Sequence, residues 1–347
     1  MPSLADLPIR PGFAPMEARL ADDLPAEPGW RFEPKWDSFR CLAFRAGGEV
    51  DLRAKSGKPL GRYFPDMVEA LKALPVSTFV VDGELTIAVD GELSFAALQM
   101  RLHPAASRVA KLAAAQPATL VLFDCLVDAR GGSLAEAPLV KRRKALEALY
   151  RRFKSPERVR LSPGTDDLAQ ARGWLAQTGA ALDGVVAKRL DGAYESGERA
   201  MLKVKRLRTA DCVVGGFRYE HDSDEVGSLL LGLYDEGGRL DHVGFTSTIT
   251  DEERPALTRR LRKLAGGAGF TGDAPGGPSR WSTERSGQWT PLKPKLVVEV
   301  RYDQVTGDRF RHGTRLLRFR PDKAPTQCTL AQLRAEAAPG RLIGELG

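Results

Sequence analysis

The stretch FEPKWDSFR, residues 32–40, decides how the rest of this chain is interpreted. It places Lys35 between the acids Glu33 and Asp37 and close to Arg40. Lys35 is either a solvated surface charge, as most lysines are, or a nucleophile. A lysine side chain in water has a pKa of about 10.4, so a nucleophilic lysine needs burial or nearby positive charge. The partners that would make Lys35 reactive have to come from elsewhere in the sequence.

The composition describes a folded protein with room for two domains. Of its 347 residues, 42% are apolar and 28% are charged, which suits neither a disordered chain nor a membrane protein. No apolar run of about 18 residues and no signal peptide is found, so a cytoplasmic location is expected. Lysine and arginine outnumber aspartate and glutamate by 52 to 45, and this net charge of +7 suits a phosphate-bearing partner.

The first 207 residues are predicted to mix strands and helices, an α+β arrangement. Hairpins are expected around the turns at residues 46–49 and at Asp90-Gly91. Apolar spacing predicts buried strands at residues 118–128 and 182–190, and helices at residues 64–74, 139–153 and 166–179. A strand-like stretch, residues 199–217, ends this half.

Beyond Thr209 the sequence changes to short strands with one inserted helix. A hairpin is expected over residues 228–247 with Gly237-Gly238 at its turn, and the helix over residues 251–266. Further strands are predicted at residues 295–307 and 314–323. This pattern favours a small oligonucleotide-binding (OB) β-barrel. We therefore expect two domains, residues 1–207 and 208–347.

Three familiar kinds of site are excluded. The four cysteines are widely spaced with no CxxC pair, which argues against a zinc site and against a disulfide scaffold. GAGFTG (Gly267 to Gly272) matches the dinucleotide fingerprint, but it follows a helix and runs into a Gly/Pro-rich loop. SGKP (Ser56 to Pro59) lacks the complete P-loop pattern. An ATP site has to be built another way.

Several residues elsewhere could make Lys35 reactive. Lys203 and Lys205 alternate in LKVK, so a strand would place both on one face. DGEL (residues 82–85) and DGVVAK (residues 183–188) put acids at predicted strand entries, where they could hold a metal ion. Phe123 lies in the middle of a predicted strand and could cover a base.

In this order, the patterns K-x-D-x-x-R, D-G-E, aromatic-D, acid-G-V-V-A-K and K-x-K resemble the successive motifs of covalent nucleotidyltransferases. That superfamily comprises ATP-dependent DNA ligases, RNA ligases and mRNA capping enzymes. RYFPD (residues 62–66), DGVVAKR and RFRPDK (residues 318–323) are most similar to bacterial ATP-dependent DNA ligases of the small ligase C type. The resemblance covers nearly the whole chain, and the ordered set of motifs is far more specific than any one of them.

The resemblance implies an adenylation (nucleotidyltransferase) domain with antiparallel sheets, followed by an OB-fold β-barrel. It implies sealing of 5′-phosphate/3′-hydroxyl nicks in duplex DNA, through a lysyl-AMP intermediate, in DNA repair. ATP and Mg²⁺ (or Mn²⁺) are the expected cofactors. The expected partners are nicked duplex DNA and repair proteins but no membrane, and the protein is expected to be a bacterial cytoplasmic monomer, associated with the nucleoid when bound to DNA.

The resemblance also implies a role for each matching residue. Lys35 attacks the α-phosphate of ATP and expels pyrophosphate. The other catalytic residues are Asp37 and the α-phosphate lysines Lys203 and Lys205. Glu33 is placed to read the adenine amino group, Glu84 to contact the ribose and Phe123 to stack on adenine.

The remaining implied contacts concern phosphates and metal. The expected ATP-binding set is completed by Arg40, Lys55, Lys188, Arg320 and Lys323. Arg320 and Lys323, with Asp322, lie in the barrel motif that engages the pyrophosphate. Asp183 and Glu84 are the expected metal ligands.

Three positions depart from the family pattern. Ser38 stands where Gly is usual, Asp183 where Glu is common, and Lys55 where Arg is frequent. Aspartate still binds Mg²⁺ through oxygen but reaches less far, and lysine keeps the charge of arginine but loses its bidentate fork. We expect an altered rate or metal preference, not an inactive protein.

Two alternatives remain open at this point. The first, within the same superfamily, is an RNA ligase or a GTP-dependent capping enzyme. The second is a non-catalytic nucleic-acid-binding protein that has kept the fold. The basic helix at residues 139–153 fits a solvated face as well as a DNA contact.

Overall fold

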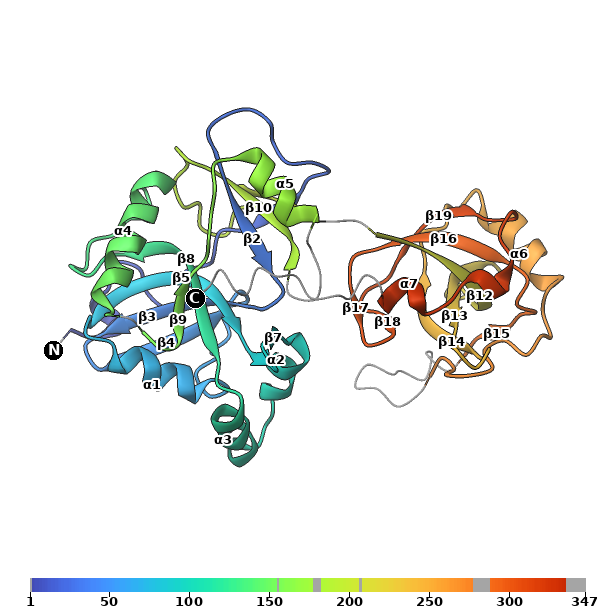
Figure 1. The fold of residues 1–347 in the computed structure, drawn as a ribbon, viewed down its shortest axis with the longest axis horizontal. Helices are drawn as coiled ribbons and strands as arrows, with labels where there is room; N and C mark the ends of the chain where they lie inside the picture. Colours follow the sequence, from blue (N-terminus) through green and yellow to red (C-terminus); the bar gives the residue numbers. More distant parts are fainter. Residues whose placement is uncertain (1, 155, 177–181, 206–207, 277–287, 335–347) are drawn as a thin grey trace. The chain divides into compact units, whose positions relative to one another are not determined.

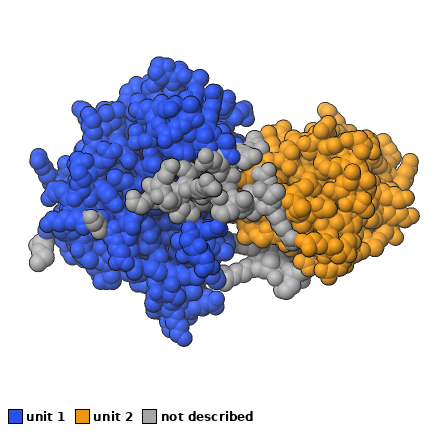
Figure 2. All heavy atoms as spheres, in the orientation of Figure 1, with its two compact units in different colours: residues 1–206, 339–347 blue, residues 207–338 orange. Residues whose placement is uncertain are grey.

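The computed structural model describes residues 2–154, 156–176, 182–205, 208–276 and 288–334 (Figure 1). The chain divides into two compact units between Arg206 and Leu207 (Figure 2). Each unit has its own apolar core, and each is described separately below. In the described residues, no helix combines the length and the apolar character needed to cross a lipid bilayer.

The first sheet of unit 1 carries Lys35. Its four strands lie in the order β1–β11–β10–β2, with bounds β1 (Ala18–Leu20), β2 (Trp30–Trp36), β10 (Leu182–Arg189) and β11 (Met201–Val204). β1 runs parallel to β11, and the other pairs are antiparallel. The register places Lys35 opposite Gly184, so the strand of the predicted nucleophile pairs with the DGVVAK motif.

The second sheet of unit 1 is larger and mainly antiparallel. Its strands lie in the order β4–β3–β5–β8–β9, with bounds β3 (Phe39–Ala46), β4 (Glu49–Ala54), β5 (Thr78–Thr86), β8 (Thr119–Val127) and β9 (Val159–Leu161). The predicted position of DGEL at a strand entry is wrong, because residues 82–85 lie well inside β5. The apolar residues on both sides of the motif extend one strand across it. The turn at Asp90-Gly91 is confirmed but belongs to a separate short hairpin, β6 (Ala88–Val89) with β7 (Glu92–Leu93).

Helices cover the outer faces of these sheets. The helices of unit 1 are the 3₁₀ turn η1 (Leu4–Asp6), α1 (Pro65–Ala73), α2 (Phe95–Arg101), α3 (Ala106–Ala115), α4 (Leu139–Arg152) and α5 (Leu168–Ala176). α1 and α4 bury Met67, Leu71 and Leu146 against the five-stranded sheet, and α5 buries Trp174 against the four-stranded sheet. Between the two sheets, Phe44 and Met201 belong to a third apolar cluster. The layers are helix, sheet, sheet and helix, and the predicted helix at residues 139–153 is confirmed.

Unit 2 is built around a curved antiparallel sheet. Its strands lie in the order β14–β13–β12–β16–β19, with bounds β12 (Arg208–Tyr219), β13 (Val226–Tyr234), β14 (Leu240–Thr246), β16 (Val297–Tyr302) and β19 (Arg315–Phe319). The smaller elements are β15 (Thr290–Pro291), β17 (Val305–Thr306), β18 (Arg309–Phe310), α6 (Arg254–Arg262), the 3₁₀ turn η3 (Pro325–Gln327) and α7 (Ala331–Arg334). The predicted hairpin with its turn at Gly237-Gly238 is confirmed.

The two edge strands of this sheet come together, as closure of a barrel requires. Thr246 at the end of β14 forms a bridge with Thr314, just before β19, and Thr248 Oγ1 accepts a hydrogen bond from the Leu316 backbone 2.8 Å away. α6 is inserted after β14 and packs on β13. GAGFTG follows α6 as irregular structure, so its predicted position in a loop is confirmed. Unit 2 has the OB fold.

Candidate active site

A cavity of about 220 Å³ in unit 1 gathers most of the predicted site residues. The predicted residues that line it are Glu33, Lys35, Arg40, Lys55, Glu84, Phe123, Lys188 and Lys203. They come from strands of both sheets, since β2, β10 and β11 belong to one sheet and β3, β5 and β8 to the other. The cavity is therefore built by residues far apart in the sequence.

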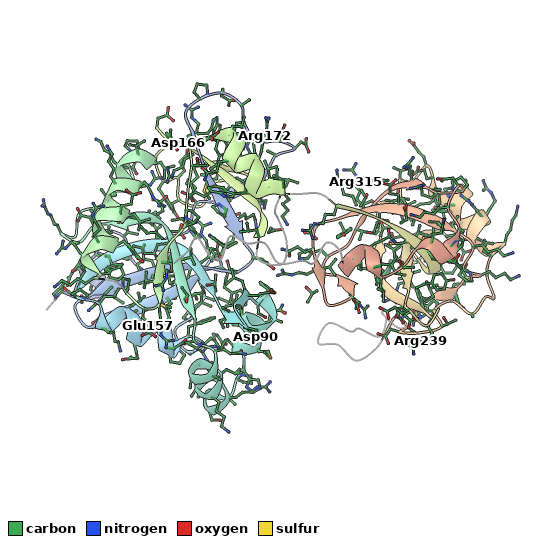
Figure 3. The ribbon with its side chains drawn as sticks, in the orientation of Figure 1. Asp90, Glu157, Asp166, Arg172, Arg239 and Arg315 are labelled. Carbon is green, nitrogen blue, oxygen red and sulfur yellow. The ribbon has the colours of Figure 1, made fainter. Side chains whose placement is uncertain are left out.

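The end of β2 holds Lys35 in a fixed position. Trp36 is buried, and its indole nitrogen donates a 3.0 Å hydrogen bond to Ser162 Oγ. At the other end of β2, Arg31 donates to Asp166 at 3.3 Å (Asp166 is labelled in Figure 3). Gly184 faces Lys35 with a φ of +147°, and a Cβ there would lie 2.1 Å from the Val204 carbonyl oxygen. Only glycine fits this position, which explains the DG pair of the DGVVAK motif.

The amine of Lys35 binds one carboxylate. Lys35 Nζ donates to Asp183 Oδ2 at 2.5 Å, and Lys205 Nζ lies 3.1 Å from the same oxygen. Asp183 is buried, whereas Lys35 is a quarter exposed. A single buried carboxylate thus holds two cations, one of which lines the cavity. Lys205 follows the last residue of β11, and the strand-like stretch predicted over residues 199–217 is divided into β11 and β12. Lys205 nevertheless lies beside Lys35, because both contact Asp183.

More positive charge surrounds Lys35. Burial lowers the pKa of Lys203, and the charges of Lys35, Lys205 and Lys55 lower it further. Lys55 binds Glu17 at 2.9 Å, and Glu17 also lines the cavity. This cluster of cations is the environment that a phosphate group needs, and it is also the positive charge that a nucleophilic lysine requires.

A buried ion pair lies in the cavity wall. Glu33 and Lys188 are each 3% exposed, and Lys188 Nζ lies 2.6 Å from Glu33 Oε2. Within the described part of the chain, Glu33 Oε1 is buried and has no hydrogen-bond partner. The Phe123 ring lies beside this pair, with Lys188 Nζ 4.2 Å from its centroid. Arg31 Nε lies 3.8 Å from Oε1, too far for a hydrogen bond. A buried acceptor without a hydrogen bond, next to an aromatic ring, is suited to a flat ligand with amino hydrogens.

Arg40 and Glu84 face each other across β3 and β5 but are held by different partners. Arg40 forms a bidentate pair with Asp82, at 2.7 Å and 2.6 Å, and Tyr194 donates to the same carboxylate at 2.5 Å. Ser38 Oγ donates to Glu84 Oε2 at 2.8 Å. Burial raises the pKa of Glu84 to about 7, against the opposing effects of the Arg40 charge and the Ser38 hydrogen bond.

The predicted residues near the C-terminus form a separate cluster within unit 2. Arg320 Nη1 lies 3.0 Å from Asp211 Oδ1, and Lys323 Nζ lies 2.5 Å from Asp211 Oδ2. Arg320 also binds Asp322 at 2.8 Å, and this hydrogen bond lowers the pKa of Asp322 to about 2. Asp211 on β12 was not predicted from the sequence, because its acid side chain matched no motif.

Other residues of the site were also missed. Asp82 and Tyr194 fix Arg40, and Glu17 pairs with Lys55. Tyr194 lies in an irregular segment, and Glu17 in the Pro-rich leader, so neither stands in a periodic pattern. Three predicted residues of unit 1 do not line the cavity, namely Asp37, Asp183 and Lys205. Asp183 and Lys205 are connected to it through the contact of Asp183 with Lys35.

The residues present fit ATP and one divalent metal ion. Glu33 Oε1, which has no hydrogen bond among the described residues, and the Phe123 ring suit an adenine, and Lys35, Lys55 and Lys203 suit phosphates. In the residues that the structure describes, no group of three or more His, Cys, Asp or Glu side chains could hold a metal by itself. Mg²⁺ is commonly held by one or two carboxylates together with substrate phosphates, and Asp183 beside the lysines could supply such a carboxylate.

Comparisons with known proteins identify the family of this chain. Residues 15–205 match the family described as the ATP dependent DNA ligase domain, and residues 222–323 match the ATP dependent DNA ligase C terminal region. The chain is 43% identical to DNA ligase C1 of Mycolicibacterium smegmatis, over 94% of this chain and 95% of that protein. It is 40% identical to DNA ligase C of Mycobacterium tuberculosis, again over 94% of this chain and 95% of that protein.

Solved structures show the same fold at lower identity. A structure from a study of Lig E DNA ligases has a TM-score of 0.56 and is 17% identical, over 88% of this chain and 99% of that one. At this identity the likeness concerns the fold alone. The two domain families and the similarity to the mycobacterial proteins establish that this chain belongs to the ATP-dependent DNA ligases.

Proposed function

We propose that this chain seals 5′-phosphate/3′-hydroxyl nicks in duplex DNA, with Lys35 as the residue that becomes adenylated. The observation that carries the proposal is the position of Lys35, whose amine lies 2.5 Å from Asp183 and lines a cavity together with Lys55 and Lys203. A surface lysine would have neither a buried carboxylate partner nor this set of cationic neighbours.

In the first step, Lys35 Nζ forms a bond to the α-phosphorus of ATP. The bond from that phosphorus to the pyrophosphate oxygen breaks, and pyrophosphate leaves with its electron pair. Nζ gives up two protons in all, and Asp183 Oδ2 is the acceptor placed for the first of them. Lys203 and Lys205 offset the negative charge that develops on the phosphoryl oxygens. We assign no step to Asp37, and we propose that Mg²⁺ or Mn²⁺, held in part by Asp183, assists at the phosphates.

The cavity wall selects the nucleotide in this proposal. Glu33 Oε1 accepts a hydrogen bond from the adenine amino group, and Phe123 stacks on the base. Glu84 contacts the ribose, and its Oε2 accepts the hydrogen bond from Ser38. Arg320 and Lys323 of unit 2 engage the pyrophosphate.

The later steps use DNA. The AMP group passes from Lys35 to the 5′-phosphate at the nick, and the adjacent 3′-hydroxyl then attacks that phosphate and releases AMP. The net charge of +7 and the relatives named DNA ligase C support DNA as the substrate. The proposal includes action as a monomer in the bacterial cytoplasm, in DNA repair and with repair proteins as partners.

The test is covalent labelling followed by sealing. The protein is incubated with ATP or GTP labelled at the α-phosphate and run on a denaturing gel, and then supplied with nicked DNA or nicked RNA duplexes. We expect label from ATP, its loss in Lys35→Ala but not in the exposed control Lys58→Ala, and sealing of nicked DNA. Label from GTP alone would contradict the proposal in favour of a capping enzyme. Absence of label with intact DNA binding would instead indicate a non-catalytic binding protein.

A further inference from the structure

Ser38 lies between β2 and β3, and its side chain forms a hydrogen bond with Glu84, an acid in the cavity wall. Its hydroxyl donates to Glu84 Oε2 at 2.8 Å, and Glu84 lines the cavity. Glycine is the residue that the resemblance implies at this position, and glycine has no side chain to form this hydrogen bond. The backbone does not require glycine here, because the non-glycine residues with positive φ in the described segments are Asp90, Lys154 and Asp222.

The Glu84 side chain takes its hydrogen bond from Ser38 and not from the neighbouring Arg40, because the guanidinium of Arg40 is bound to Asp82. Arg40 is the register partner of Glu84 on β3, but both of its carboxylate contacts go to Asp82. A further donor group of Arg40 binds the Met16 carbonyl oxygen at 3.0 Å, and Tyr194 holds Asp82 from its other side. The Arg40–Asp82 pair is thereby held by two further residues, Met16 and Tyr194.

The consequence is a carboxylate with one oxygen fixed. Across the described ranges, no cationic nitrogen lies within 4.0 Å of Glu84, and Ser38 is its one hydrogen-bond partner. That bond occupies Oε2 and restricts rotation of the carboxylate, while Oε1 stays available to a ligand in the cavity. A glycine in place of Ser38 could donate no such bond.

We propose that Ser38 is a positioning residue, whose hydroxyl orients Glu84 toward the ribose hydroxyls of ATP and so increases the preference for a ribonucleotide. The inference rests on the proposed function, in which Glu84 contacts the ribose. Ser38 itself touches no substrate. Its hydrogen bond already restricts the orientation of Glu84 in the free protein. Less side-chain entropy is therefore lost when the nucleotide binds.

The experiment compares dissociation constants for ATP and 2′,3′-dideoxy-ATP in the Lys35→Ala background, where no transfer follows binding. Ser38→Ala removes the hydroxyl and keeps the Cβ, and Ser38→Thr keeps a hydroxyl. We expect Ser38→Ala to weaken ATP binding about fivefold and to change dideoxy-ATP binding less than about twofold, with Ser38→Thr close to the parent. Ser107→Ala, an exposed serine of α3, is the control that should change neither.

A double-mutant cycle with Glu84→Ala separates positioning from a general structural effect. If Ser38 acts through Glu84, then Ser38→Ala has no further effect on ATP binding once Glu84 is alanine. Equal weakening of both nucleotides, or effects of Ser38→Ala and Glu84→Ala that simply add, would overturn the inference. Failure of the unmodified protein to form covalent AMP would overturn the proposed function instead, and it would leave these binding ratios measurable.

Discussion

Lys35 Nζ lies 2.5 Å from Asp183 Oδ2, although the two residues are 148 positions apart in the chain. Lys205 shares the same oxygen at 3.1 Å, so Asp183 offsets the repulsion between two cations. An acid in this position can hold the amine where it attacks, accept its proton and contribute to a metal site. Removing it should therefore affect chemistry more than nucleotide binding.

We expect Asp183→Asn to lower the rate of self-adenylation by at least about 100-fold, because it removes the charge that organises Lys35 and Lys205. Asp183→Glu, which restores the acid that is common in the family, should stay within about 10-fold of the parent. The measurement is the initial rate of covalent labelling by ATP. Asp191→Asn, at an exposed acid shortly after β10, is the control. A parental rate in Asp183→Asn would contradict the role assigned to this carboxylate.

The buried pair Glu33–Lys188 gives a prediction on stability. Glu33→Leu leaves Lys188 buried without a counter-charge, and we expect the free energy of unfolding to fall by about 3–5 kcal/mol. The double variant Glu33→Leu/Lys188→Met should recover most of this loss in urea unfolding, although it should not bind ATP normally. Glu69→Leu breaks the exposed pair with Lys72 and should cost less than about 1 kcal/mol. If Glu33→Leu is as mild as Glu69→Leu, the pair is not buried in solution.

Arg320 should contribute to self-adenylation, in which pyrophosphate leaves, but not to the final sealing of the nick. Arg320→Ala removes a cation from the Arg320–Asp211–Lys323 cluster, and we expect it to slow self-adenylation by at least about 100-fold. Sealing of a nick that already carries AMP should stay within about threefold of the parent, because no pyrophosphate leaves in that step. Arg239→Ala, at the exposed residue labelled in Figure 3, should change neither rate. Equal losses in both assays would show that Arg320 serves DNA binding or stability.

Unit 2 should lose stability in mild acid through His242. Burial, together with the charges of Arg309 and Arg218, lowers the pKa of His242 from 6.5 to about 3. Arg309 Nη2 lies 2.8 Å from His242 Nδ1, and because arginine can only donate, this nitrogen accepts and the ring is neutral. Between pH 6.5 and 3 the unfolded chain binds a proton that the folded chain does not, so the free energy of unfolding falls as the pH falls.

The expected loss from His242 is about 1.4 kcal/mol for each pH unit below 6.5, or about 2 kcal/mol at pH 5. His242→Gln should remove this part of the pH dependence in urea unfolding followed between pH 7 and 5. His221→Gln, at an exposed histidine, should leave the dependence as it is. If the free energy of unfolding depends on pH in the same way in the parent and in His242→Gln, the folded protein accepts a proton on this ring without losing stability, and the prediction is wrong.

The sequence predicted the elements and most of the cavity because both depend on local patterns. Alternation and apolar runs predicted β3, β8 and β10, and the ordered motifs predicted eight residues that line the cavity. The position of DGEL was wrong because a glycine inside a strand gives the same local signal as a turn. Gly83 is buried in β5 for another reason, since a Cβ there would lie 2.6 Å from the Val121 carbonyl oxygen.

What the sequence could not predict is which charged groups pair. Arg40 was expected to serve the nucleotide directly, but its guanidinium is paired with Asp82, whose carboxylate also accepts a hydrogen bond from Tyr194. Asp211 holds Arg320 and Lys323 from a strand more than 100 positions earlier. Such pairs depend on strand register and on depth in the fold, and neither is visible in a single stretch of sequence.

The edge position of β2 has a consequence for synthesis on the ribosome. β2 pairs with β10, Phe32 bridges to Thr165, and Trp36 donates to Ser162, so these partners all come more than 120 residues later. At translation rates of about 5–20 residues per second they emerge on the order of 10 seconds after Lys35 does. The segment that carries the nucleophile therefore spends this time as a nascent strand without its neighbours, and the nucleotide site is completed only after β10 and β11 have left the exit tunnel.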